Sequence, residues 1–150
     1  MNASYGRFFA MILTSTGVML ALMYSTVYVA DHIWWSQTKG WMALYMGAAM
    51  AIVMLAFMLG MYKDKTTNLL IFGGAAALFI AGLFFVRAQT TVGDVAWMKA
   101  MIPHHSIAIL TSERAQISDP RVRQLADEII EAQRREIAEM EALIDSLERR

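Results

Sequence analysis

Long stretches without charged residues dominate the first part of the chain, and they predict its elements. Three such stretches cover roughly residues 8–30, 40–62 and 66–86. Each is near or above the ~20 apolar residues that a helix needs to cross ~30 Å of hydrocarbon. Aromatic residues that favour the membrane interface lie toward their ends: Tyr5, Phe8, Phe9, Tyr28, Trp34, Trp35, Trp41 and Tyr62. The pattern predicts three transmembrane helices, and the length of the first argues against a cleaved signal peptide.

After residue 93, apolar residues recur at the three- and four-residue spacing of an amphipathic helix. This spacing predicts a helix from about Asp94 to Gln116. Pro103 lies inside it, and proline removes one backbone donor and clashes with the preceding turn. We therefore expect a kink or a restart of the helix at Pro103.

A second amphipathic helix is expected to begin at Pro120, with Asp119 as its N-cap, and to run to about Glu148. Its apolar seam is close to a heptad repeat: Val122, Leu125, Ile129, Ile137, Met140, Leu143 or Ile144, and Leu147. Two helices alone leave much of this seam uncovered. We therefore expect two hairpins to pair into a four-helix bundle, as a homodimer or a higher homo-oligomer.

Charge divides the chain at about the same place as the apolar pattern. Six charged residues precede Arg87, and twenty lie from Arg87 onward. This predicts an all-α protein with a three-helix transmembrane region, residues 1–88, and a helical-hairpin domain, residues 89–150. After Arg87 there are eight basic and eleven acidic residues, so nucleic-acid binding is not expected. The absence of cysteine excludes disulfides, thiolate metal sites and thiol nucleophiles.

The basic residues near the predicted membrane segments indicate an orientation. Arg7, Lys63 and Lys65 would lie on one side of the bilayer, against Lys39 and Arg87 on the other. Because basic residues in short loops favour the cytoplasmic side, the larger group is expected inside. The hairpin domain is then expected outside the cytoplasm, attached to the membrane.

Methionine recurs at every fourth position of the second apolar stretch: Met42, Met46, Met50, Met54 and Met58. In a helix of 3.6 residues per turn these side chains form a slowly winding ridge. Thioethers bind soft ions such as Cu(I), but methionine also fills gaps between packed helices. We favour packing for this ridge.

The hairpin contains the candidate chemistry. On helical wheels, potential ligands fall on the inner faces of both helices: Asp94, Met98, Met101, His104, His105, Gln133, Glu136 and Met140. Imidazole, thioether and carboxylate together form a metal-ligand set, and copper heads the affinity order for divalent first-row ions. The sequence predicts a copper site, with zinc or another divalent transition metal as the alternative.

Other interpretations of these residues stay open. A histidine on an apolar face is often a core residue, and Glu136 could simply accept a hydrogen bond from His105. The hairpin would then be an assembly module. His32 is interpreted as an interfacial residue rather than a ligand. An enzyme using metal-assisted redox chemistry is a third class, but no motif selects a reaction.

Three sequence blocks carry a resemblance to a known family. They are Met101-Ile102-Pro103-His104-His105, then Leu125-Ala126-Asp127-Glu128-Ile129, then Gln133-Arg134-Arg135-Glu136-Ile137. The stretch that contains them resembles the bacterial family catalogued as domain of unknown function 305. The resemblance implies a ferritin-like helical bundle outside the cytoplasm, with copper binding reported among members and methionine and histidine as ligands.

Carried over residue by residue, the resemblance assigns the ligand role to Met98, Met101, His104, His105 and Met140. It leaves Asp94, Gln133 and Glu136 as additional ligands or as hydrogen-bond partners of the ligands. Thr111 stands where many relatives have methionine, and longer relatives have more helices than one hairpin. The function this implies is membrane-anchored capture or buffering of copper, with transfer to a metal-handling partner.

Overall fold

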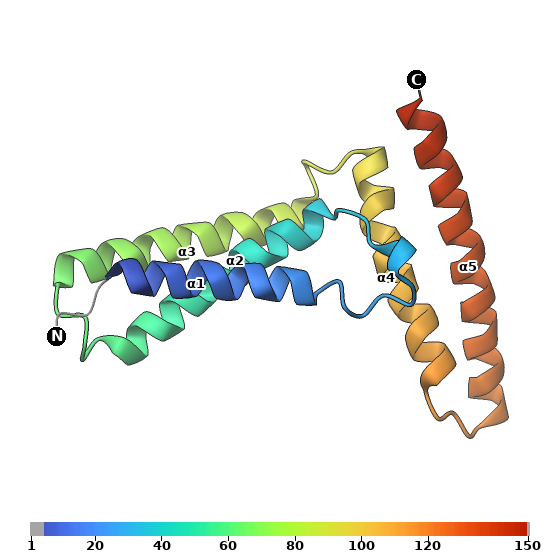
Figure 1. Cartoon of the computed structure of the whole chain (residues 1–150), viewed down its shortest axis with the longest axis horizontal. Helices are drawn as coiled ribbons and strands as arrows, with labels where there is room; N and C mark the ends of the chain where they lie inside the picture. Colours follow the sequence, from blue (N-terminus) through green and yellow to red (C-terminus); the bar gives the residue numbers. More distant parts are fainter. Residues whose placement is uncertain (1–4, 150) are drawn as a thin grey trace. The chain divides into compact units, whose positions relative to one another are not determined.

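The computed structural model describes residues 5–149, and these residues form α-helices and one short 3₁₀ helix (Figure 1). The order is α1 (Tyr5–Leu22), η1 (Ala30–His32), α2 (Gln37–Met58), α3 (Lys65–Ala88), α4 (Asp94–Arg114) and α5 (Pro120–Glu148). No strand occurs among the described residues. Helices α1, α2 and α3 are long and apolar enough to cross a membrane. The predicted all-α fold, with three long apolar helices followed by a hairpin, is confirmed.

The described residues divide into two compact units. The first contains residues 5–22 and 38–91, and the second contains residues 23–37 and 92–149. The segment 23–37, which connects α1 to α2, therefore packs with the hairpin and not with the three long helices. The predicted boundary at residue 88 had grouped the segment 23–37 with the three long helices.

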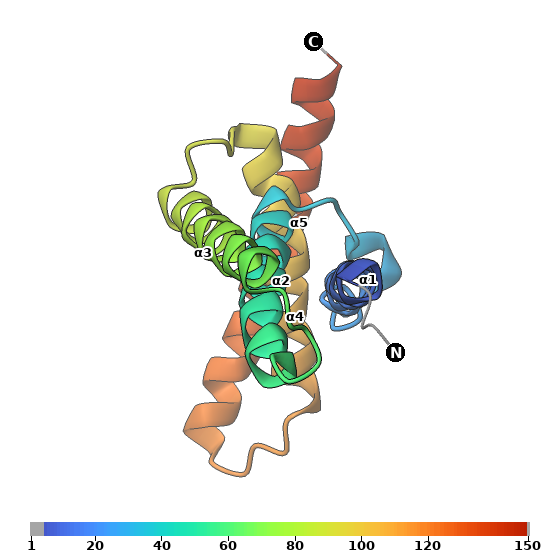
Figure 2. The ribbon, with the colours of Figure 1, turned by 90° about the vertical axis from the view of Figure 1, so that its left-hand side faces the viewer.

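Within the first unit, α2 lies between α1 and α3 (Figure 2). Small residues permit close approach at the α2–α3 contact. A Cβ atom added to Gly82 would lie 3.0 Å from the Cβ of Tyr45 and 3.1 Å from its backbone nitrogen. Glycine at this position therefore sets how closely the two helices approach, as expected for helices packed in a membrane.

The core of the first unit joins all three helices. Its buried apolar residues are Phe8, Ile12, Ala51, Leu55, Tyr62, Ile71 and Ala75. Met50, Met54 and Met58 pack against this cluster as partly buried side chains. This is the arrangement expected of methionines that fill gaps between helices.

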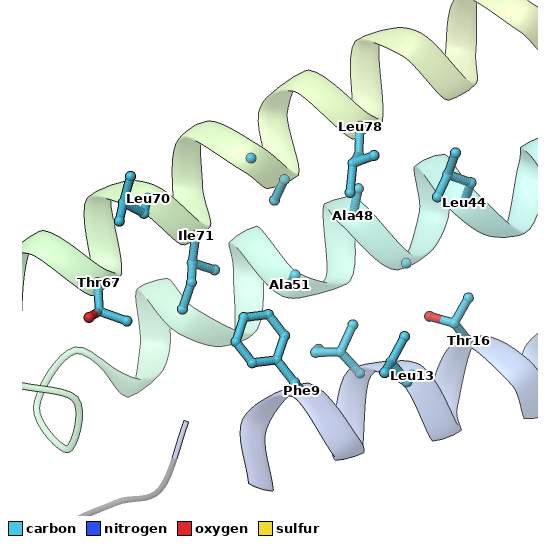
Figure 3. Close-up of a pocket in the computed structure, with 14 residues that line it drawn as sticks. Phe9, Leu13, Thr16, Leu44, Ala48, Ala51, Thr67, Leu70, Ile71 and Leu78 are labelled. Atoms are coloured by element: carbon cyan, nitrogen blue, oxygen red, sulfur yellow. The ribbon is translucent and has the colours of Figure 1, made fainter. Parts of the chain in front are cut away.

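An apolar hollow of about 490 Å³ opens between the three helices (Figure 3). Phe9, Leu13 and Thr16 of α1 face Ala48 and Ala51 of α2 across it. Residues of α3 complete the lining, and Thr16 and Thr67 are the polar residues within it. No charged side chain lines this hollow among the described residues.

The first predicted membrane segment was too long. The charge-free stretch reaches residue 30, but α1 ends at Leu22 and the chain then turns. Tyr28 and Trp34, expected at a membrane interface, instead pack against the core of the hairpin. Apolar composition alone does not distinguish a segment buried in lipid from one buried against another helix.

In the second unit, α4 and α5 form an antiparallel hairpin (Figure 1). A kink or a restart was expected at Pro103, and the restart does not occur, because α4 continues through this residue from Asp94 to Arg114. The proline ring is almost completely buried, and its packing offsets part of the cost of the missing donor.

The predicted start of α5 is confirmed. Asp119 is its N-cap, and one carboxylate oxygen accepts a hydrogen bond from the backbone N–H of Arg121 at 2.8 Å. The guanidinium group of Arg121 and this N–H hold the pKa of Asp119 below its ordinary value. Pro120 occupies the first turn, where its missing N–H costs nothing.

The apolar seam of α5 divides into two faces. Ile137, Met140 and Ile144 are buried against α4, with Met98, Ile102 and Ile109 on the other side of the core. Other members of the predicted seam remain substantially exposed: Val122, Leu125, Leu143 and Leu147. The hairpin therefore buries only part of the apolar surface that the sequence provides.

Candidate metal site

His105 is the best-positioned of the predicted ligands. It lies one helical turn after Met101 on α4, and its Nδ1 is 3.0 Å from the Met101 carbonyl oxygen. Its Nε2 is 2.8 Å from Oε2 of Glu136 on α5. The imidazole is therefore fixed from both sides, and it bridges the two helices of the hairpin. The side chain of His105 is 16% exposed and that of Glu136 is 46% exposed.

Both partners of the His105 ring are hydrogen-bond acceptors, which constrains what the ring can do. A backbone carbonyl only accepts, and so does an ionised carboxylate. Both contacts are therefore hydrogen bonds only when both ring nitrogens carry a proton. A metal ion at Nε2 must replace the proton there, while the Nδ1–H bond to Met101 would keep the ring oriented.

The spacing of His105 and Glu136 also suits two ligands of one ion. Transition-metal bonds to imidazole nitrogen and carboxylate oxygen are about 2.0–2.1 Å long, so two such ligands at a right angle lie about 2.9 Å apart. The observed separation of 2.8 Å is close to this value. A cation could thus replace the shared proton with little movement of either side chain.

His104 does not join this pair. It is exposed, and its ring centroid lies 6.3 Å from that of His105, with the planes inclined at 64°. Consecutive residues of a helix point about 100° apart, which explains the divergence. Because α4 continues through Pro103, the helix does not restart between Met101 and the two histidines.

The predicted thioether ligands lie in or beside the core of the hairpin. Met98 is 4% exposed and Met140 is 7% exposed, and both belong to the buried cluster. Met101 is partly buried and packs against that cluster. These positions are those of core side chains, adjacent to the His105–Glu136 pair.

The remaining predicted residues are placed differently. Asp94 is exposed and lines a hollow of about 420 Å³ together with Met98 and Trp97. It lies eleven residues before His105, which is about 16 Å along a helix. Gln133 is half-buried, one turn before Glu136. Among residues 5–149, no three His, Asp or Glu side chains gather where they could hold one ion.

A second polar cluster lies on the opposite edge of α4, and sequence reasoning missed it. Ser106 is fully buried, and its Oγ accepts a hydrogen bond from the backbone N–H of Tyr28 at 2.6 Å. The same Oγ is 2.8 Å from Nδ1 of His32. Ser106 thereby fastens the segment 23–37 to α4, and His32 serves this packing contact.

Charged residues extend this second cluster toward α5. Arg134 pairs with Glu113 at 2.9 Å and lies over the ring of Tyr28, 6.0 Å from its centroid. A hydrogen bond to Glu113 raises the pKa of Tyr28. Lys99 similarly lies 5.4 Å from the ring centroid of Trp34 and pairs with Glu148. In the sequence, the aromatic residues Tyr28 and Trp34 of the segment 23–37 are the feature that could have indicated these contacts.

Comparison with known proteins bears on the hairpin most directly. Residues 85–149 match the family described as "Domain of unknown function (DUF305)". This segment is similar to DUF305 domains. The predicted family is therefore confirmed for the part of the chain that contains the His105–Glu136 pair, and the match covers both helices of the hairpin.

One relative of the chain extends the similarity beyond the DUF305 domain. An uncharacterized protein of Acanthamoeba polyphaga mimivirus is 33% identical over 108 residues, which is 71% of this chain and 64% of that protein. The chain thus spans less than two thirds of the relative's length. A match of this length cannot fit within residues 85–149, so it includes part of the long apolar helices. No solved structure matches the chain.

Proposed function

We propose that the chain is a membrane-anchored metal-binding protein that captures or buffers copper through its DUF305 hairpin. The observation that supports this best is the geometry of His105. Its ring is oriented by a backbone carbonyl, and its second nitrogen lies at a ligand-like distance from a carboxylate of the neighbouring helix. Metal-binding histidines commonly have their other ring nitrogen held in this way.

The neighbouring donors favour copper over other ions. Imidazole nitrogen and carboxylate oxygen suit Cu(II), which heads the affinity order for divalent first-row ions. Met101 and Met140 lie close by in the core and offer thioethers, which suit Cu(I). A site beside such residues would accept copper in both oxidation states, which fits a role in holding the ion and passing it to a metal-handling partner.

The three apolar helices indicate where copper binding would take place. Three helices long and apolar enough to span a bilayer precede the hairpin. The distribution of Lys and Arg between their ends favours a hairpin outside the cytoplasm, where a bound ion would be intercepted before uptake.

The test is copper binding by the full chain, purified without an affinity tag. We expect that His105→Ala and Glu136→Gln each reduce copper affinity at least about 10-fold, which is the lower end of losses at ligands and their oriented partners. Met50→Leu, which alters a methionine packed in the membrane unit, is the matched control and should leave affinity unchanged. Equal losses in all three variants would contradict the assignment.

The second candidate is an assembly module whose histidines are structural. It is favoured by the burial of Met98 and Met140 and by the two hydrogen bonds that already satisfy His105. The two candidates differ in their response to metal. A protein that carries no copper after purification, and whose melting temperature does not change when copper is added, would be an assembly module.

A further inference from the structure

The exposed apolar residues of α5 form a strip centred on Glu136. At 100° per residue, three of them fall within about 20° of Glu136 on the helical wheel, namely Leu125, Leu143 and Leu147, and the half-buried Ile129 falls in the same range. Leu125 is 56% exposed and Leu143 is 47% exposed. The residues of α5 that are buried against α4 lie on an adjacent face. The strip is therefore a second apolar face that the single hairpin leaves open.

The spacing of the strip is symmetric. Leu125 and Ile129 precede Glu136 by eleven and seven residues, and Leu143 and Leu147 follow it by seven and eleven. Reversing the helix end for end about Glu136 thus places the strip on itself. A surface with this property is complementary to an antiparallel copy related by a two-fold axis through Glu136, as in isologous interfaces. Leu125 would then face Leu147 of the partner subunit.

A further feature of the same face agrees with this axis. The hollow of about 420 Å³ is lined by Leu143 and Leu147, at the end of the strip where Leu125 of the partner subunit would lie.

Charge along the outer edge of the strip is also complementary. Arg135 and Glu139 are both exposed beside Glu136 on α5. In the antiparallel arrangement, Arg135 would lie about 3 Å along the helix axis from Glu139 of the partner subunit, within reach of an ion pair. The two-fold axis repeats this pair on both sides of the centre.

We propose that two hairpins pair antiparallel through this strip, and that a divalent copper ion binds on the two-fold axis between His105 and Glu136 of both subunits. Within residues 5–149, a single chain brings these two donors into contact without a third His, Asp or Glu, whereas the pair supplies two imidazole nitrogens and two carboxylate oxygens. Two carboxylates brought together repel each other, and a cation between them removes this repulsion. The inference rests on the proposed function, and it specifies that the site is shared between two copies.

Cross-linking of the full chain in detergent tests the register, because the protein contains no cysteine of its own. Leu125→Cys and Leu147→Cys are prepared separately, with one carrying a tag that changes its mass. A short bis-maleimide should link the two variants when they are mixed and should link neither variant to itself. Self-linking of each variant alone would indicate a parallel pair, and no product in any sample would indicate no pairing through this strip; either result overturns the proposal.

Light scattering combined with copper titration tests the shared site. We expect a dimer that binds one copper ion per two chains. Leu143→Glu lies seven residues from the proposed ligand and should abolish the dimer and lower copper affinity at least about 10-fold. Ala142→Glu adds the same charge to an exposed residue off the strip, and it should change neither property.

The outcomes separate this inference from the proposed function. One copper ion bound per monomer, still dependent on His105, would overturn the shared site and leave the proposed function standing. A dimer with the cross-linking pattern above that binds no copper would overturn the proposed function and the metal half of the inference, while leaving the antiparallel pairing in place.

Discussion

Two consecutive residues of α4 contact different partners on two sides of the hairpin. His105 points toward α5 and contacts Glu136, whereas Ser106 contacts the segment 23–37. The 100° step between neighbouring helical residues produces this division. The candidate metal site and the attachment of the α1–α2 connection are thus one residue apart in sequence, yet their side chains have separate partners.

Ser106 allows a test of this attachment. Ser106→Ala removes the acceptor of the Tyr28 N–H and the partner of His32 Nδ1. A buried polar group left without its partner costs about 1–3 kcal/mol. Amide hydrogen exchange in the segment 23–37 should therefore accelerate, while exchange in α5 changes little. Ser118→Ala, at an exposed serine of the α4–α5 loop, is the control. Unchanged exchange at Tyr28 would show that Ser106 does not fasten the segment.

At the scale of the helix, residue size fixes the packing of α2 against α3. Gly82 faces the backbone of Tyr45 and the carbonyl oxygen of Trp41, whereas Gly73 on the same helix has no atom within 4 Å of an added Cβ. The two glycines are alike in sequence and differ only in what surrounds them. Their substitution by alanine therefore separates packing from helix propensity.

Gly82→Ala should destabilise the three-helix unit by about 1–3 kcal/mol, the usual cost of overpacking. The added methyl group would lie 3.1 Å from a backbone nitrogen and 3.2 Å from a backbone carbonyl oxygen, and neither can rotate away. Gly73→Ala should be neutral or slightly stabilising, because alanine favours the helix. Thermal unfolding in detergent measures both, and equal melting temperatures for the two variants would contradict the packing at Gly82.

Helix limits were predictable where local chemistry determines them. Asp119 followed by Pro120 indicates a cap and a first turn, and α5 begins there. Of the kink or restart expected at Pro103, the restart does not occur, because α4 continues through this buried residue. The end of α1 at Leu22 could not be predicted, since Tyr28 and Trp34 beyond it pack against the core of the hairpin.

The candidate site was predicted in composition but not in arrangement. Helical periodicity places His105 and Glu136 on facing sides, and the structure joins them at 2.8 Å. Periodicity cannot show that Met98 lies deep in the core or that His104 stays exposed. Those distinctions depend on how closely α4 and α5 approach, which their side chains determine jointly.

At the scale of the whole molecule, the hairpin is completed by a segment from far earlier in the chain. Tyr28 and Trp34 pack against its core, and the buried Ser106 accepts a hydrogen bond from the backbone of this segment. A hairpin cut from the chain at the family boundary would lack these contacts. It would expose apolar surface and leave the Ser106 hydroxyl without its native partners.

A peptide with the sequence of residues 23–37 should therefore stabilise an isolated fragment of residues 89–149. We expect the peptide to raise the melting temperature of the fragment in a concentration-dependent way, since a ligand that binds only the folded state stabilises it by mass action. The control is the same peptide with Tyr28→Ala and Trp34→Ala, which removes the two side chains that pack on the core. Circular dichroism at increasing peptide concentration measures the effect. Equal stabilisation by both peptides would show that the segment does not complete the hairpin core.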